Sequence, residues 1–323
     1  MAEPLRLVFD HMLSDHLSGR GIDPGELEAA KGRFEAVHAE VEGRRATGEL
    51  GFYALPYADD VVRQILDFAD RTRGRFDAVV VLGIGGSALG TTTLFHALVP
   101  PFWNERSAEE RGGLPRLYVL DNVDPTTMAP LLERLDPERV LFNVVSKSGT
   151  TAETMAQFLI VRQWLENALG ERYRDHLVFT TDPEKGVLRR LADDEKIAAF
   201  PIPTNVGGRF SVLSAVGLLP AALLGIDIRA LLDGARAMDE RCRSTSLDDN
   251  PAGLFAVLQH LAHTLAGAPM HVLMAYSDRL YPAADWFRQL WAESLGKRHD
   301  RAGAEVFRGP TPLKALGATD QHS

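Results

Sequence analysis

From residue 76 onward, short apolar runs rich in β-branched residues alternate with stretches of helical pattern. The runs over 78–82 (AVVVL), 117–120, 140–145 (VLFNVV), 177–180 and 197–202 predict strands, and the longer segments between them predict helices. These strands are apolar throughout, which is typical of strands buried on both faces. The alternation therefore restricts the chain to an α/β fold, in which helices cover both sides of a parallel sheet.

The pattern divides the chain into three parts. Residues 1–70 are predicted to form an N-terminal helical segment, because Asp23-Pro24 can begin a helix over 23–45 and a helix-rich stretch covers 52–70. Residues 71–228 are predicted to form a first α/β unit, in which Asp124-Pro125 begins a helix that runs to about Leu135. Residues 229–323 form a second, smaller one, in which Asn250-Pro251 begins a helix. The charged stretch 229–250 is expected to be a loop or an inter-domain connection.

Membrane and targeting signals are weak in this sequence. The longest uncharged run, residues 210–226, is short for a bilayer span and contains Pro220, so it is predicted to be a buried core helix. The N-terminus lacks the basic and apolar regions of a signal peptide. The chain has one cysteine, Cys242, which excludes an intrachain disulfide and fits a reducing, cytoplasmic location.

Charge and histidine spacing narrow the range of partners. With 35 Lys and Arg against 44 Asp and Glu, the net charge is −9, so a broad basic face for nucleic acid is not expected. A local site could still bind a small anion. His260 and His263 lie three residues apart on an apolar helix and are predicted to be packing residues, so we expect no metal site.

Two loops follow predicted strands and precede predicted helices. Such loops lie at the carboxyl ends of the strands, where open parallel sheets bind their ligands. Residues 83–87 (GIGGS) allow close backbone approach at a helix N-terminus, although a tight turn without ligand is an alternative. With Ala88 they also fit the dinucleotide pattern G-x-G-x-x-A, but Asp121 lies too far away for the usual acidic partner. Residues 146–151 (SKSGTT) place hydroxyls and an ammonium group around a helix start, which favours a phosphomonoester.

Two further segments carry charged side chains next to apolar sequence. Arg209 precedes the uncharged run and is expected to pair with a buried anion or ligand, with a structural salt bridge as the alternative. Gln289 and Glu293 are four residues apart on one helix face. Glu293 could act as a general base, although an exposed helical glutamate is the simpler interpretation from spacing alone.

Four segments together resemble a known family. They are LGIGGSALG, SKSGTTAET, TNVGGRFSVLSAVG and QLWAESLGK, and they occur in the same order as in bacterial-type phosphoglucose isomerases. The resemblance runs from about residue 50 to residue 323. The segment over 204–217 looks like the family signature and is the most specific of the four.

The resemblance implies two sugar-isomerase (SIS) α/β sandwich subdomains of unequal size, with the active site between them. It implies interconversion of glucose 6-phosphate and fructose 6-phosphate without a cofactor. Phosphate contacts fall on Gly86, Ser87, Ser146, Lys147, Ser148 and Thr151, and sugar contacts on Gly208 and Gln289. The family often has threonine where Ser148 stands.

The catalytic groups implied by the resemblance are Glu293 as the base, Arg209 for the enediolate and His322 for ring opening. The family supplies this histidine from the partner subunit of a homodimer, and Glu153 matches a carboxylate that supports it. Family members continue past the histidine with a helix that carries an active-site lysine. We therefore expect the 323-residue chain to be less active, less stable or both.

Three alternatives stay open at this point. A catalytically silent SIS module would need the phosphate loops but not Arg209, Glu293 and His322 together. A Rossmann dehydrogenase would need the dinucleotide pattern, which the SKSGTT loop disfavours. A dual phosphoglucose/phosphomannose isomerase would differ only in its tolerance of mannose 6-phosphate.

Overall fold

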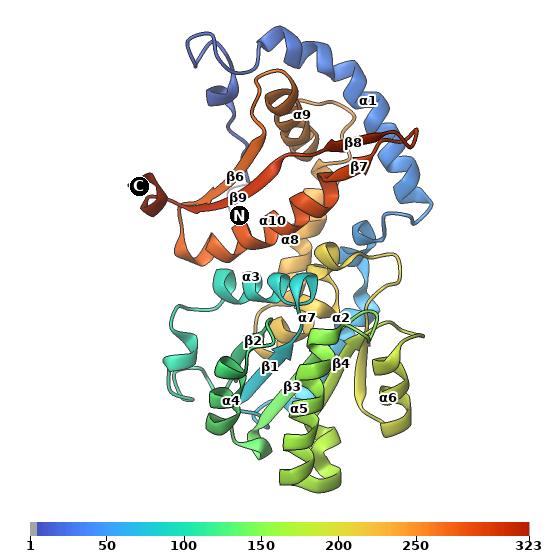
Figure 1. The fold of residues 1–323 in the computed structure, drawn as a ribbon, viewed down its shortest axis with the longest axis vertical. Coiled ribbons are helices and arrows are strands. Elements are labelled where there is room, and N and C mark those ends of the chain that lie inside the picture. The colour runs from blue at the N-terminus through green and yellow to red at the C-terminus, as the bar shows by residue number, and fades with distance from the viewer. Residues whose placement is uncertain (1–4, 323) are drawn as a thin grey trace.

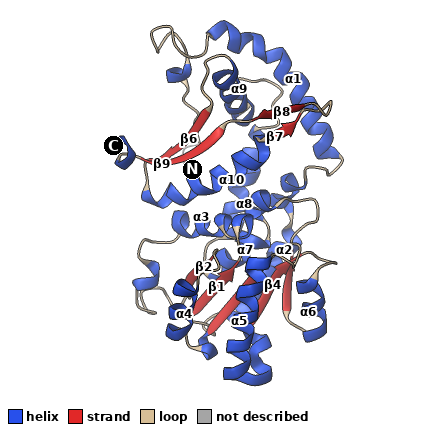
Figure 2. Cartoon of the chain, in the orientation of Figure 1, coloured by secondary structure: helices blue, strands red, loops and turns tan. Residues whose placement is uncertain are grey.

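Five parallel strands form the central sheet of the first unit in the computed structural model, which describes residues 5–322. The sheet order is β2-β1-β3-β4-β5. Its strands, which are red in Figure 2, are β1 (Ala78–Leu82), β2 (Arg116–Leu120), β3 (Val140–Val145), β4 (Leu177–Thr181) and β5 (Ala198–Pro201). The chain reverses its winding direction between β1 and β3, which lie side by side in register from Ala78↔Val140. The predicted α/β fold with a parallel sheet is confirmed.

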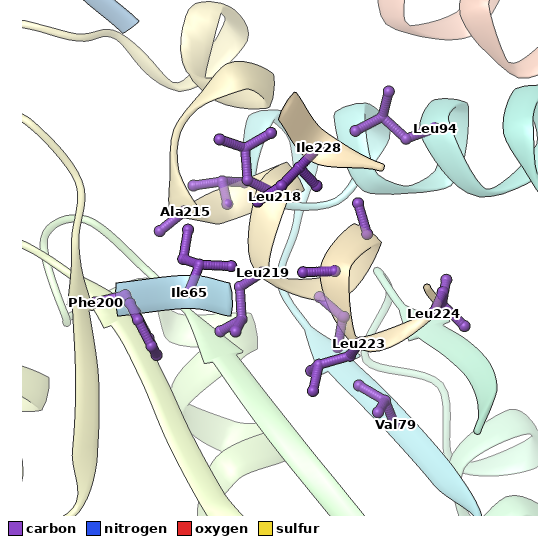
Figure 3. Close-up of a cluster of buried hydrophobic side chains, with 14 of the residues drawn as sticks. Ile65, Val79, Leu94, Phe200, Ala215, Leu218, Leu219, Leu223, Leu224 and Ile228 are labelled. Carbon is purple, nitrogen blue, oxygen red and sulfur yellow. The ribbon is translucent and has the colours of Figure 1, made fainter. Parts of the chain in front are cut away.

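Helices cover both faces of this sheet, because successive strand residues point to opposite sides. In β1, Val79 and Val81 join one core cluster while Val80 and Leu82 join the other. The first face is covered by α2 (Asp59–Thr72), α3 (Leu89–Leu98) and α7 (Ala215–Leu223), and Figure 3 shows the side chains of this cluster. The second face is covered by α4 (Pro125–Arg134), α5 (Ala152–Leu169) and α6 (Val187–Glu195).

The second unit contains a smaller parallel pair. β6 (Met270–Ala275) pairs with β9 (Thr311–Leu316), and a separate antiparallel hairpin joins β7 (Lys297–His299) to β8 (Glu305–Arg308). This unit also holds α9 (Pro251–Thr264) and α10 (Tyr281–Leu295). The two units lie one above the other along the long axis of the molecule, with α3 and α10 meeting between them (Figure 1).

The N-terminal helices divide between the two units. α1 (Pro24–Ala46) packs on α9 through a third cluster that includes Phe34, Leu254 and Leu258. By contrast, α2 packs on α7 in the first unit. The boundaries 1–70, 71–228 and 229–323 therefore stay a prediction.

Within residues 5–322, every helix is too short or too polar to cross a membrane.

Three predicted helix starts are present, and each uses the same local chemistry. The side chains of Asp23, Asp124 and Asn250 accept hydrogen bonds from backbone amides at the start of α1, α4 and α9. A proline follows each of these residues and occupies the first helical position, where its missing N–H costs nothing.

Two local expectations are wrong. The first part of the charged stretch is a helix, α8 (Ile228–Arg241), because its charges lie mostly outward while Ile228, Leu232 and Asp239 are buried. Residues 242–250 form the expected loop. The uncharged run is not a single helix. A 3₁₀ turn over Gly208–Leu213 precedes α7, and Ser214 caps the new start by accepting from the Val216 amide. This break positions the Arg209 loop.

Candidate active site

The first two loops lie side by side at the point where the sheet reverses its winding. Residues 83–87 follow β1 and residues 146–151 follow β3, and these strands are neighbours. A crevice outside the carboxyl ends of strands at such a switch point is where open α/β sheets bind ligands. The N-terminal ends of α3 and α5 both face this edge, so the local field favours an anion.

A third loop, over residues 205–211 (NVGGRFS), packs against the first loop at Gly86 and Gly208. A Cβ on Gly86 would overlap the backbone carbonyl carbon and oxygen of Gly208, so only glycine allows this approach. The Ser211 hydroxyl lies within hydrogen-bond distance of both Gly208 O, at 2.7 Å, and Gly86 O, at 3.2 Å. The backbone amides of the two loops are thereby held at a set spacing.

Lys147 joins the second loop to the third. Its Nζ donates to the carbonyl oxygens of Thr204, at 2.6 Å, and Val206, at 3.0 Å. Within the second loop, the buried Ser146 hydroxyl contacts Thr151 Oγ1 at 2.9 Å and accepts from the Gly149 amide. Ser148 is exposed, and Ser87 is half-buried. Their roles toward phosphate stay predictions.

Helix α10 brings the Glu293 carboxylate to the loop that carries Arg209. Arg209 Nη1 lies 3.4 Å from Glu293 Oε2, and Gln289 Nε2 donates to Glu293 Oε1 at 2.9 Å. The Trp286 indole N–H donates to the backbone carbonyl of Arg209 at 3.2 Å. The Glu293 side chain is about half exposed, at 48%, so a ligand can reach it.

Gln289 also faces the first loop. A Cβ on Gly85, which has a φ of +56°, would lie 2.9 Å from Gln289 Nε2. Among the described residues, the buried Gln289 Oε1 has no hydrogen-bond partner. An acceptor left open beside the carboxylate suits a hydroxyl donor on a ligand.

Comparisons with known proteins place this chain in a family. The family model described as phosphoglucose isomerase matches residues 59–323. The glucose-6-phosphate isomerase of Carboxydothermus hydrogenoformans is 48% identical over 320 residues, which cover 99% of this chain and 68% of that relative. The chain belongs to the phosphoglucose isomerase family.

Other members and solved structures extend the match. A glucose-6-phosphate isomerase of Thermus thermophilus is 44% identical, and the match covers 92% of this chain and 66% of that relative. A crystal structure of a hypothetical protein from the same organism has a TM-score of 0.83 at 41% identity, over 93% of this chain and 68% of that one. The chain spans about two thirds of the length of these phosphoglucose isomerase relatives.

A crystal structure of a glucose-6-phosphate isomerase from Chlamydia trachomatis also shares the fold. It has a TM-score of 0.80 at 25% identity and covers 94% of this chain and 63% of the other. The family-model match over residues 59–323 includes the three loops and α10.

The structure brings together most of the predicted site residues but not all of them. Gly86, Gly208, Arg209, Gln289 and Glu293 meet in one cluster, and Lys147 ties the adjacent loop to it. Glu153 lies exposed in the first turn of α5. His322 lies exposed in the segment after β9. The end of β9 lies beside the end of β6, the strand that precedes α10, whereas Glu293 is near the other end of that helix (Figure 1).

Three residues that belong to this cluster were not predicted from the sequence. They are Ser211, Trp286 and Ser294, which contact Gly208, the Arg209 carbonyl and the Arg209 side chain. Ser211 stands inside the signature segment and Ser294 follows Glu293, so position next to a predicted residue was the available signal. Arg209 is 77 residues away from Trp286 in sequence and 85 residues away from Ser294, and no local sequence pattern reveals contacts over such separations.

We expect Gly86→Ala to lower kcat/KM by about 100-fold, because the added methyl group forces the Gly208 backbone and Arg209 out of place. Steady-state kinetics on the purified variant measures this. Gly234→Ala is the matched control, since nothing lies within 4 Å of its Cβ in α8 and alanine favours helix. Equal kinetics of Gly86→Ala and the unmodified chain would contradict the argument.

Proposed function

We propose that this chain interconverts D-glucose 6-phosphate and D-fructose 6-phosphate. The observation that carries the proposal is the Glu293 carboxylate beside the Arg209 guanidinium, at the edge of the sheet where two loops and two helix starts favour an anion. The relatives named glucose-6-phosphate isomerase at 44 to 48% identity support it.

Isomerisation requires one hydrogen to move between C2 and C1 of the open-chain sugar. The Glu293 carboxylate takes the proton from C2, and the bonding pair forms the C1=C2 double bond of a cis-enediolate. The same group returns the proton to C1. Over the reaction, one proton also passes from O2 to O1, so the aldose becomes a ketose with no atom gained or lost.

The intermediate carries negative charge on oxygen, and Arg209 lies where it can stabilise that charge. The half-buried guanidinium, 26% exposed, is screened less by water than a fully exposed one. Phosphate held by Ser87, Ser148 and the loop amides supplies binding energy away from the reacting carbons and so orients them. Lys147 adds a positive charge at the same edge.

Ring opening needs a further acid–base group, and we assign it to His322 of a second copy in a homodimer. Within one chain, residues 281 to 293 of α10 span about 18 Å. The strand that leads to His322, β9, ends on the side where α10 begins, whereas Glu293 is near the other end of that helix. A partner chain could instead present the exposed histidine, with Glu153 to orient it. A cytoplasmic location completes the proposal and fits the single cysteine.

Mixing two inactive variants tests the shared site. Glu293→Gln and His322→Ala are each expected to be nearly inactive, while a mixture that exchanges subunits recovers about a quarter of the original activity, because half of the dimers then contain one intact site. A coupled assay after mixing measures this. A mixture as inactive as its components, in a sample shown by light scattering to be dimeric, would contradict a shared site.

Formation of fructose 6-phosphate, followed in a coupled assay, tests the function itself. Turnover supports the isomerase. Binding of glucose 6-phosphate by calorimetry without turnover would support a catalytically silent sugar-phosphate module. Turnover of mannose 6-phosphate as well would indicate a dual phosphoglucose/phosphomannose isomerase.

A further inference from the structure

The shortest hydrogen bond to the Arg209 side chain comes from a residue with no assigned role. Arg209 Nε donates to Ser294 Oγ at 2.8 Å, whereas the Nη1 contact with Glu293 is longer, at 3.4 Å. Ser294 is half-buried in the last turn of α10. The main constraint on the guanidinium direction is therefore a neutral hydroxyl and not the carboxylate.

A second contact fixes the plane of the same group. The Arg209 guanidinium carbon lies 4.5 Å from the centroid of the Phe210 ring, and this ring stacks on Phe52 at 4.7 Å with an interplanar angle of 14°. A guanidinium is planar, with its five N–H donors in a rigid fork. Stacking holds its plane and the Nε bond sets its rotation within that plane, so the Nη groups are held toward Glu293.

The chemistry of serine suits this task. A carboxylate in the same place would pair with Arg209 and neutralise part of the charge that an anionic intermediate needs. A hydroxyl accepts the Nε–H bond and leaves the positive charge available. Serine is also a poorer helix former than alanine, so helix stability does not account for its presence at this position.

We propose that Ser294 is a positioning residue that orients Arg209 toward the enediolate, a role that rests on the function proposed above. Glu293 and Ser294 are consecutive on α10, so one turn of one helix sets both the base and the direction of the cation. Ser294 acts through Arg209 and does not itself need to touch the sugar.

The kinetic test compares Ser294→Ala with Ser294→Thr. Loss of one hydrogen bond to a charged group is expected to lower kcat by about 10- to 100-fold in Ser294→Ala, with KM changed less than about threefold. Ser294→Thr keeps the hydroxyl and should recover most of kcat. The melting temperature of Ser294→Ala should not fall, since alanine favours helix. Ser277→Ala is the control and should leave kcat unchanged. Ser277 precedes the 3₁₀ turn Asp278–Leu280 that leads into α10, and its side chain makes no capping hydrogen bond.

A binding test separates this proposal from the function on which it rests. Calorimetry on the full chain uses two probes: a sugar-phosphate hydroxamate, whose planar anionic group imitates the enediolate, and a hexitol 6-phosphate, which has no such group. Ser294→Ala should weaken the hydroxamate by about tenfold and leave the hexitol phosphate unchanged.

The outcomes of these measurements are distinct. Equal weakening of both probes, hydroxamate affinity unchanged in Ser294→Ala, or no recovery in Ser294→Thr would overturn the role of Ser294 while leaving the isomerase proposal in place. Failure of the unmodified chain to bind either probe would overturn the proposed function, and the role of Ser294 with it.

Discussion

Glu293→Gln is expected to lower kcat by about 10²- to 10⁴-fold, the usual contribution of a positioned general base. Glutamine has nearly the same shape, and its amide oxygen can still accept the Gln289 Nε2 hydrogen bond that is 2.9 Å long in the present structure. It cannot take a proton from C2. Because the phosphate loops are untouched, affinity for a hexitol 6-phosphate should change little. The coupled assay and calorimetry measure the two effects separately.

A second readout identifies the missing step directly. In D₂O the unmodified chain should exchange the C2 hydrogen of glucose 6-phosphate with solvent while the intermediate exists, and Glu293→Gln should not. Glu305→Gln is the matched control, because Glu305 is an exposed glutamate on β8 that pairs with Arg298 at 2.8 Å. Full turnover by Glu293→Gln would show that another group is the base.

Asp239→Asn is expected to lower the free energy of unfolding by about 3 to 5 kcal/mol, the cost of breaking a buried ion pair from one side. Asp239 lies on α8 with its side chain 7% exposed. It accepts two hydrogen bonds of 2.7 Å from Arg45 at the end of α1 and one of 2.6 Å from Tyr57. The substitution removes the carboxylate charge that Arg45 meets at 2.7 Å, and among the described residues the remaining charge partner of Arg45 is the more exposed Glu42, at 3.7 Å. It also loosens the joint between α1 and α8.

Urea denaturation of Asp239→Asn and of the unmodified chain measures this loss of stability. Asp233→Asn is the matched control on the same helix, because its carboxylate is 67% exposed and pairs with Arg236 one turn away. Such surface pairs contribute about 0 to 1 kcal/mol. A similar denaturation midpoint for Asp239→Asn and Asp233→Asn would contradict the buried joint.

The pH dependence gives an independent check on Asp239. Burial alone would raise the pKa of this carboxyl, but hydrogen bonds from Arg45, Tyr57 and Arg243 outweigh it and lower the pKa to about 2, from 3.8. A carboxyl with a lowered folded-state pKa stabilises the fold above its unfolded pKa, and that contribution is lost as pH falls from about 4 to 2. The shift corresponds to about 2 kcal/mol. The free energy of unfolding of Asp239→Asn should therefore fall less between pH 4 and pH 2 than that of the unmodified chain. An equal fall in both proteins would contradict a lowered pKa for Asp239.

Local chemistry made parts of the fold predictable. Asp23, Asp124 and Asn250 before prolines indicated helix starts, and the apolar runs over β1 and β3 indicated buried strands. Helix α8 was missed because its buried carboxylate, Asp239, looks like a surface residue until Arg45 and Tyr57 are seen beside it. Its partners lie 194 and 182 residues away in sequence, which periodicity does not reach.

The sequence by itself determined the residue types and their local settings: glycines before a helix start, hydroxyls around Lys147, and Glu293 four residues after Gln289 on one helix face. Only the tertiary structure decided which of these meet. The strand order 2-1-3-4-5 brings the loops after β1 and β3 together, and the Gly86–Gly208 contact brings Arg209 to α10. The reason is that side-chain periodicity reports contacts along one element, whereas the partner of Arg209, Ser294, is set by how whole elements pack.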